Sequence, residues 1–85
     1  MPQVEIYTQP FCPFCEAALA LLRRKGAAVT EYDAPRGSAA RAEAIRRSGG
    51  RETVPQIFIG GRHIGGCDDL MALERAGELD RLLAE

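Results

Sequence analysis

The sequence predicts an α/β fold, a four-stranded mixed sheet flanked by helices in the order βαβαββα, formed by one domain over residues 1–85. Two observations predict this class. Segments with alternating apolar residues, typical of strands, are interleaved with segments of helical periodicity. Two adjacent glycines then separate the last two strand-like segments, as in a two-residue hairpin. We therefore expect a parallel first pair of strands, joined by a right-handed crossover, and an antiparallel last pair.

The first half of the chain is expected to form two strand–helix pairs. Alternation and helical periodicity predict a strand over 3–8, a helix over 13–25, a strand over 28–33 and a polar helix over 38–47. The apolar stripe of the first helix is expected to consist of Ala17, Ala18, Leu21 and Leu22. Gly26 is expected to follow the end of this helix, because glycine adopts the left-handed conformation at that position at little cost.

The second half is expected to form the hairpin and a last helix. A strand is predicted over 54–59 and a second over 62–64, with Gly60 and Gly61 as the turn. Asp68 is the expected N-cap of the helix that follows, because its carboxylate can accept backbone N–H bonds there. Leu70, Leu73 and Ala76 are expected to face inwards, and Gly77 to break the helix. Three leucines beyond the break are expected to cover the sheet edge: Leu79, Leu82 and Leu83.

Composition excludes several classes of function. The 46% hydrophobic content argues against disorder, and no apolar run approaches the length that crosses a membrane. A net charge of −1 gives no electrostatic basis for binding nucleic acid, and most of the clustered arginines are expected on solvated helix faces. Three cysteines without a targeting segment fit a reducing cytoplasm, where cysteines serve redox chemistry rather than structural disulfides.

Cys12 and Cys15, three residues apart between the first strand and the first helix, form the main candidate site. Pro13 suits the first helical position, where its missing N–H is not needed, and Cys12 then falls at the N-cap. The free N–H groups of the first turn and the positive end of the helix dipole favour a thiolate there. We therefore expect Cys12 to be the nucleophile and Cys15, one turn further on, to be the resolving thiol.

The cysteine pair has two other interpretations. A structural disulfide at this spacing would close too small a loop to restrict the unfolded chain much. A zinc-binding module remains an alternative, because Cys12, Cys15, His63 and Cys67 supply four potential ligands. The apolar residues between the first two cysteines and the long α/β segment before His63 count against it. His63 is expected on the surface of the hairpin rather than as a catalytic base.

Three motifs in this order, CPFC at 12–15, Thr53 to Pro55 and Gly65 to Asp69, give the chain a specific resemblance. Over nearly its whole length it resembles the dithiol glutaredoxins of bacteria. The resemblance implies a thioredoxin-like fold and a monomer that uses glutathione, without a metal, to reduce glutathione mixed disulfides and protein disulfides. Ribonucleotide reductase is among the protein partners that it implies.

The resemblance also implies where glutathione lies. Pro55 follows a cis peptide bond, and the backbone of Val54 pairs with the cysteinyl part. The γ-glutamyl end lies at the loop before the last helix, where N–H groups suit a carboxylate and aspartates suit an ammonium group. The residues expected to contact glutathione are Gln9, Phe14, Arg51, Thr53, Val54, Pro55, Gly66, Cys67, Asp68 and Asp69. Asp69 has the alternative role of stabilising the helix dipole. Cys67 is expected to pack and to supply its N–H, with a regulatory or dimerising disulfide as the alternative.

This chain departs from the family pattern at two positions. Gln9 stands where the family commonly has a lysine that holds the glycyl carboxylate, and Phe14 stands where tyrosine is usual. Arg51 is a candidate replacement for the missing lysine, with a solvated surface position as the alternative. Some glutaredoxins instead carry a [2Fe–2S] cluster between two copies; Pro13 counts against that alternative, since those members usually have a smaller or more flexible residue there.

Overall fold

The computed structural model describes residues 2–85, and its elements follow the predicted order with one helix added at the end. The elements are β1 (Val4–Thr8), α1 (Pro13–Arg24), β2 (Val29–Asp33), α2 (Ala39–Arg47), β3 (Gln56–Ile59), β4 (Arg62–Gly65), α3 (Cys67–Arg75) and α4 (Glu78–Ala84). The arrangement confirms the predicted α/β class with a four-stranded mixed sheet flanked by helices. No helix in this part of the chain is both long and apolar enough to cross a membrane.

The sheet has the strand order β2-β1-β3-β4. Strand β1 pairs in parallel with β2, and β3 pairs antiparallel with β4, as the sequence predicts. Strand β1 also pairs antiparallel with β3. The hairpin turn is confirmed as well, because Gly60 and Gly61 have φ angles of 60° and 81°. Residues with a side chain rarely adopt this left-handed conformation at two successive positions, so the glycine pair fixes the register of the hairpin.

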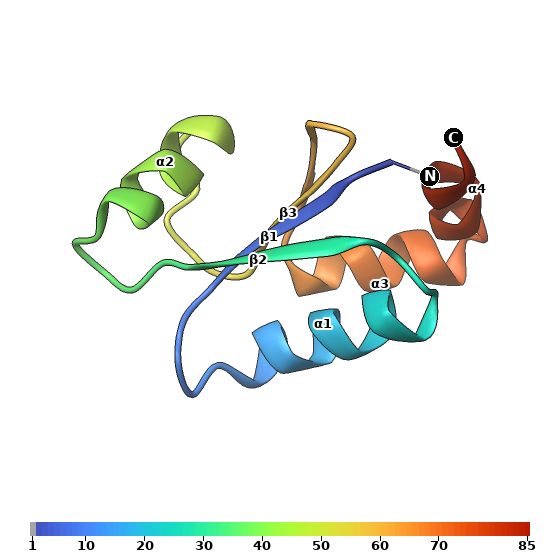
Figure 1. Cartoon of the computed structure of the whole chain (residues 1–85), viewed down its shortest axis with the longest axis horizontal. Helices are drawn as coiled ribbons and strands as arrows, with labels where there is room; N and C mark the ends of the chain where they lie inside the picture. Colours follow the sequence, from blue (N-terminus) through green and yellow to red (C-terminus); the bar gives the residue numbers. More distant parts are fainter. Residues whose placement is uncertain (1) are drawn as a thin grey trace.

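Helices cover both faces of the sheet (Figure 1): α1 and α3 lie on one face and α2 on the other. Along β1 the side chains alternate, so Val4 and Ile6 point into the main core while Tyr7 points beneath α2. The main core also contains buried residues of α1, α3 and α4, including Leu19, Leu22, Leu70, Leu79 and Leu83. One sheet therefore holds the start of α1 and the start of α3 in fixed positions on the same face.

The face beneath α2 has a smaller core in which an arginine takes part. The Arg47 guanidinium lies 4.0 Å from the centre of the Phe58 ring and 3.0 Å from the Glu5 carboxylate. It also donates a hydrogen bond of 2.9 Å to the hydroxyl of Tyr7. Stacking on aromatic rings and pairing with a carboxylate suit the planar guanidinium. The expectation that the basic residues of this helix are solvated is therefore wrong for Arg47.

Two details of the predicted helices are wrong. In α1, Ala17 is exposed and Leu19 is buried, because the face that packs on the sheet follows 15, 18, 19 and 22 along the helix. In α3, the N-cap is Gly66 rather than Asp68, because the carboxylate that bonds the cap N–H belongs to Asp69. Ala76 follows the helix and is exposed rather than inward-facing.

The C-terminal leucines form a helix of their own. Gly77 breaks the chain as predicted, with a φ of 73°, and α4 follows directly. Leu79 and Leu83 are buried in the main core, while Leu82 is half-buried. Lys25, which follows α1, pairs with Glu74 and Asp80 at 2.9 and 2.8 Å and so ties the end of α1 to α3 and α4.

Candidate active site

Cys12 is the N-cap of α1, as the sequence predicts. Its backbone is extended (φ −113°, ψ 99°), and Pro13 opens the helix. The backbone N–H of Cys15 donates a hydrogen bond of 3.3 Å to the Cys12 sulfur. The sulfur therefore lies at the positive end of the helix dipole, where negative charge is stabilised. Cys12 is 9% exposed, so an incoming disulfide can reach it only through a small opening.

Cys15 differs from Cys12 in its surroundings. Its side chain is only 1% exposed, and burial raises the pKa of its thiol to about 12, with a further contribution from the hydrogen bond to Cys12. Cys15 therefore keeps its proton at neutral pH, and it acquires nucleophilic character only when the neighbouring sulfur or its surroundings change. This difference favours Cys12 for the first attack and Cys15 as the second thiol.

Alkylation of the reduced protein is expected to modify Cys12 alone. With iodoacetamide at pH 8, a thiol of pKa about 12 has roughly one ten-thousandth of its molecules as thiolate, and only the thiolate reacts. Burial also raises the pKa of Cys67. Peptide mass mapping should therefore find one modified cysteine in the folded protein and three after unfolding in urea. Early modification of Cys15 or Cys67 in the folded protein would contradict this assignment of roles.

The loop that leads into Cys12 carries an exposed aromatic residue in an unusual conformation. Phe11 has a φ of 59° and a relative exposure of 103%. The left-handed region costs a residue with a side chain about 1–2 kcal/mol. Sequence reasoning did not single out Phe11, because periodicity says nothing of a residue that lies between a strand and a helix. Phe14, in the first turn of α1, is 64% exposed.

The segment from Thr53 to Pro55 has the backbone that the resemblance implies. The Val54–Pro55 peptide bond is cis. Behind it, the buried side chain of Gln56 donates a hydrogen bond of 3.0 Å to the carbonyl of Thr53. His63 lies 2.8 Å from the other end of the same amide and 5.1 Å from the ring centre of Phe58. Gln56 thus connects this segment to the hairpin.

His63 is half-buried and serves the hairpin rather than the cysteines. Burial lowers the pKa of its imidazole, and the nearby Arg51 charge adds to this effect. Across residues 2–85, the structure contains no group of three or more His, Cys, Asp or Glu side chains arranged to hold a metal ion. The arrangement therefore does not bring His63 together with the three cysteines as the zinc-binding alternative requires.

The start of α3 lines a pocket of about 140 Å³. Asp69 Oδ2 accepts hydrogen bonds from the Gly66 N–H at 2.9 Å and from Arg51 Nη1 at 3.2 Å. These two donors hold the pKa of Asp69 below its ordinary value. Gly65 has a φ of 123°, and a Cβ there would collide with the Asp69 carboxylate. The lining consists of Phe14, Arg51, Thr53, Val54, Pro55, Gly66, Cys67, Asp68 and Asp69.

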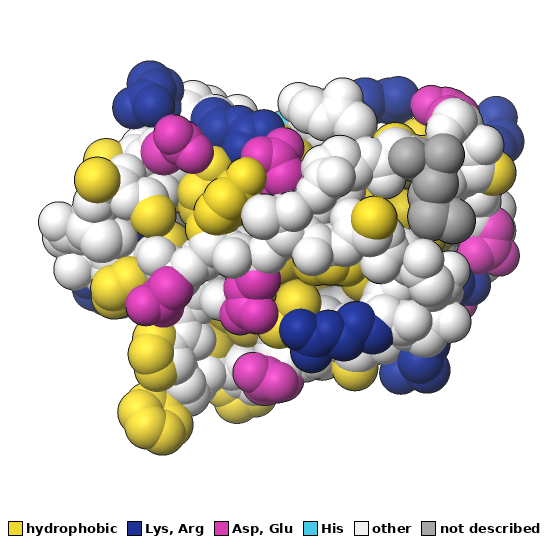
Figure 2. All heavy atoms as spheres, viewed as in Figure 1, with side chains coloured by type: hydrophobic (Ala, Val, Ile, Leu, Met, Phe, Trp, Pro, Cys, Tyr) yellow, Lys and Arg dark blue, Asp and Glu magenta, His cyan; other side chains and the backbone are white. Residues whose placement is uncertain are grey.

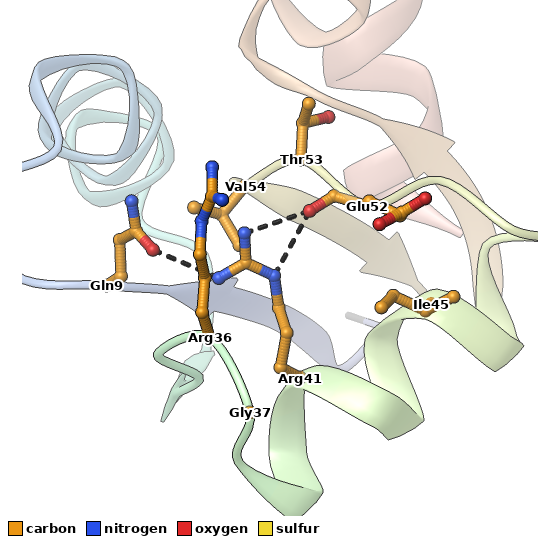
Figure 3. Close-up of a pocket in the computed structure, with 8 residues that line it drawn as sticks. All are labelled: Gln9, Arg36, Gly37, Arg41, Ile45, Glu52, Thr53 and Val54. Carbon is orange, nitrogen blue, oxygen red and sulfur yellow. Dashed lines mark hydrogen bonds between the residues drawn. The ribbon is translucent and has the colours of Figure 1, made fainter.

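A larger pocket of about 420 Å³ lies on the other side of Thr53 and Val54, between the segment after β1 and α2 (Figure 3). Arg41 is 6% exposed beneath it. Its guanidinium donates hydrogen bonds of 3.0 Å to Gln9 Oε1, 2.8 Å to the Ala34 carbonyl, and 2.9 and 3.1 Å to the Glu52 carbonyl. The lining consists of Gln9, Arg36, Gly37, Arg41, Ile45, Glu52, Thr53 and Val54.

The structure separates two residues that the sequence analysis had linked. Nine of the ten residues expected to contact glutathione line the smaller pocket, and Gln9 lines the larger one. Arg51, the candidate replacement for a lysine at the position of Gln9, pairs with Asp69 in the smaller pocket. Arg36 and Arg41 are the cations that share a pocket with Gln9. Sequence reasoning missed both. Arg36 is exposed in the loop before α2, and a polar helix gives no signal for a buried arginine such as Arg41.

Comparisons with known proteins agree with this geometry. The family model described as Glutaredoxin matches residues 4–64. Glutaredoxin 3 of Escherichia coli is 55% identical over 83 residues, which cover 98% of this chain and 99% of that protein. The solution structure of glutaredoxin from Brucella melitensis is 59% identical, with a TM-score of 0.83 over 98% of this chain and 89% of that one. The crystal structure of a buckwheat glutaredoxin–glutathione complex is 31% identical, with a TM-score of 0.85 over 98% and 77%.

Proposed function

Because the chain belongs to the glutaredoxin family of thiol–disulfide oxidoreductases, we propose that glutathione is its electron donor. Its substrates in this proposal are glutathione mixed disulfides and protein disulfides. The single observation that carries the proposal is the Cys12 sulfur at the N-cap of α1, bonded to the Cys15 N–H. The structure of a related glutaredoxin in complex with glutathione supports glutathione as the electron donor.

On a glutathione mixed disulfide, the reaction needs only one cysteine. The Cys12 thiolate attacks the glutathione sulfur, a disulfide forms between Cys12 and glutathione, and the substrate cysteine leaves as a thiolate that takes up a proton. A second glutathione thiolate then attacks the glutathione sulfur bound to Cys12. This step releases oxidised glutathione and restores the Cys12 thiolate. The sulfur of the second glutathione has then been oxidised and the substrate sulfur reduced, whereas the first glutathione sulfur has passed from one disulfide to another.

On a protein disulfide, the proposal uses both cysteines. Cys12 attacks one substrate sulfur and the other leaves as a thiolate. Once Cys12 is bonded in the mixed disulfide, its sulfur no longer carries the charge that disfavours ionisation of Cys15. Cys15 then loses its proton and attacks Cys12, which releases the second substrate thiol and leaves a disulfide between the two cysteines. Two glutathione molecules reduce this disulfide and leave as oxidised glutathione.

The smaller pocket suits the γ-glutamyl end of glutathione, which carries an ammonium group and a carboxylate. The first N–H groups of α3 have no partner within the helix and can donate hydrogen bonds to a carboxylate. Asp68 lies beside them and is exposed, so it is open to the ammonium group. Asp69 is already bonded to Gly66 and Arg51, and we assign it the positioning of this loop.

The larger pocket suits the glycyl carboxylate, with Arg36 supplying the charge that Gln9 lacks. Replacing Arg36 by alanine is expected to raise the KM for a glutathione mixed disulfide about fivefold and to leave kcat unchanged, because an exposed ion pair contributes about 1 kcal/mol or less. The measurement is steady-state kinetics at low and high salt, with Arg75→Ala as the control on the far end of α3. An unchanged KM at low salt would remove Arg36 from the site.

The proposal also covers the location of the protein in the cell, its oligomeric state and its protein substrates. We place the protein, as a monomer, in a reducing cytoplasm, where its three cysteines stay available as thiols. Protein disulfides of the kind found in ribonucleotide reductase fall within its proposed substrates. The support for these points is the family of the chain together with its cysteine content.

The proposal is tested by the choice of electron donor. The purified protein is given the mixed disulfide of cysteine and glutathione, with either glutathione and glutathione reductase or thioredoxin reductase as the source of electrons. We expect NADPH consumption with the first system and none above background with the second. Turnover only with thioredoxin reductase would overturn the assignment of glutathione as donor while leaving the thiol–disulfide chemistry intact.

A further inference from the structure

We propose that Phe11 forms an apolar docking point for protein substrates, so that the protein favours cysteines flanked by apolar residues. This inference rests on the function proposed above, because it concerns the same reacting sulfur. It goes beyond that function by naming a residue that distinguishes polypeptide substrates from small disulfides.

The first observation is the distribution of exposed hydrophobic side chains. Among the residues that the structure describes, the only large hydrophobic side chains that are exposed are Phe11 and Phe14. Both lie within three residues of Cys12. Single exposed apolar residues are common on protein surfaces, but here they are confined to the surroundings of one reactive atom. Figure 2 shows hydrophobic side chains projecting from the corner where Figure 1 places the loop before α1.

The second observation is the backbone of Phe11. Its φ of 59° is a conformation that phenylalanine rarely adopts and that glycine or asparagine adopts more readily. The ring belongs to neither hydrophobic cluster of the fold, so no packing within the chain compensates for this conformation. The loop therefore keeps an aromatic ring in solvent beside Cys12. The unfavourable backbone conformation of Phe11 is not offset by any packing of its ring within the chain.

The geometry of the reaction determines which part of a substrate lies against the Phe11 ring. In either route, the substrate cysteine is separated from the Cys12 sulfur by at most two sulfur–sulfur bonds of about 2 Å each. The residues next to that cysteine must then lie against the residues next to Cys12. Glutathione has no apolar side chain to offer Phe11, whereas a polypeptide has one whenever a neighbour of its cysteine is apolar.

The composition of the loop around Phe11 also favours an apolar partner. Apart from the reacting thiolate of Cys12, residues 9–15 carry no charged side chain, so neighbouring side chains offer no ionic selection. Burying an apolar side chain against an exposed ring is favourable in proportion to the area removed from water. The occupant that fits is a polypeptide with an apolar residue beside its reactive cysteine.

The experiment compares two pentapeptides that differ only beside the reactive sulfur. Each has a central glutathionylated cysteine, placed between two leucines in one peptide and between two serines in the other. The mixed disulfide of cysteine and glutathione is the small substrate. The variant is Phe11→Asn, which removes the ring but tolerates the left-handed backbone. Phe11→Leu is the matched control, because it keeps an apolar side chain at the same position.

The wild type is expected to have a kcat/KM about fivefold higher for the leucine peptide than for the serine peptide, a smaller ratio than a closed pocket achieves. Phe11→Asn should reduce this ratio to about 1 and leave the rate on the small substrate unchanged, whereas Phe11→Leu should keep most of the preference. These results together would support the docking role.

Several results would overturn it. They are equal rates on both peptides for the wild type, a preference that survives in Phe11→Asn, or an equal loss of all three activities in that variant. A wild-type dimer seen by sedimentation that Phe11→Asn converts to a monomer would assign the ring to self-association instead. If the wild type does not reduce the small substrate at all, the proposed function fails first, and this outcome is distinct from a missing peptide preference.

Discussion

Replacing Cys12 by serine is expected to lower the rate of reduction of the mixed disulfide of cysteine and glutathione by about three orders of magnitude or more. The hydroxyl of serine stays protonated at neutral pH, and the hydrogen bond from the Cys15 N–H cannot change that. Cys15 cannot take over, because it is 1% exposed and its pKa is raised to about 12. The measurement is the initial rate in the assay coupled to glutathione reductase.

Cys15→Ser is the matched control, since it lies one turn further along the same helix. It should keep most of the activity on the mixed disulfide, which needs only Cys12, and lose the reduction of a protein disulfide such as that of insulin. Comparable losses on the mixed disulfide in the two variants would contradict the roles assigned here. Circular dichroism of both variants checks that the loss is chemical and not a loss of fold.

Replacing Arg41 by methionine is expected to destabilise the protein by about 2–4 kcal/mol. The guanidinium is 6% exposed and bonds three oxygens, those of the Gln9 amide, the Ala34 carbonyl and the Glu52 carbonyl. Methionine fills similar volume but leaves these acceptors without their donor. The free energy of unfolding is measured from urea titrations followed by circular dichroism.

The control for this prediction is Arg46→Met, on the same helix but with its guanidinium largely exposed. It should change the free energy of unfolding by less than about 0.5 kcal/mol. Since Arg41 also orients Gln9 and the Glu52 carbonyl, Arg41→Met is expected to raise the KM for the mixed disulfide at temperatures where it remains folded. Equal stability of the two variants would show that the buried hydrogen bonds contribute little.

The fold and the reacting pair could be predicted because they depend on local patterns. Strand β1 and helix α1 follow from residue periodicity, and the hairpin follows from two glycines that share a positive φ. The N-cap position of Cys12 follows from Pro13 alone. The resemblance to glutaredoxins correctly implied the cis bond before Pro55. In each case, neighbours in the chain supply most of the information.

The site around that pair depends on contacts between segments far apart in the sequence. Arg51 and Asp69 meet across 18 residues, and Arg41 reaches Gln9 across 32. A charged residue on a polar helix has the same local pattern whether it is solvated or buried, so the sequence could not distinguish Arg41 from Arg46. Only the packing of α2 beside the segment after β1 decides which of them is buried.

The sequence by itself therefore determined the order of the elements, the family and the place of Cys12 and Cys15 at the start of α1, because periodicity, turn residues and helix capping act within a few residues. The tertiary structure alone decided which cations line each pocket, that Gly66 and not Asp68 is the N-cap of α3, and that Phe11 is left in solvent beside Cys12. The physical reason is that burial and hydrogen-bond partners depend on how the sheet brings separate segments together, and no local pattern encodes that geometry.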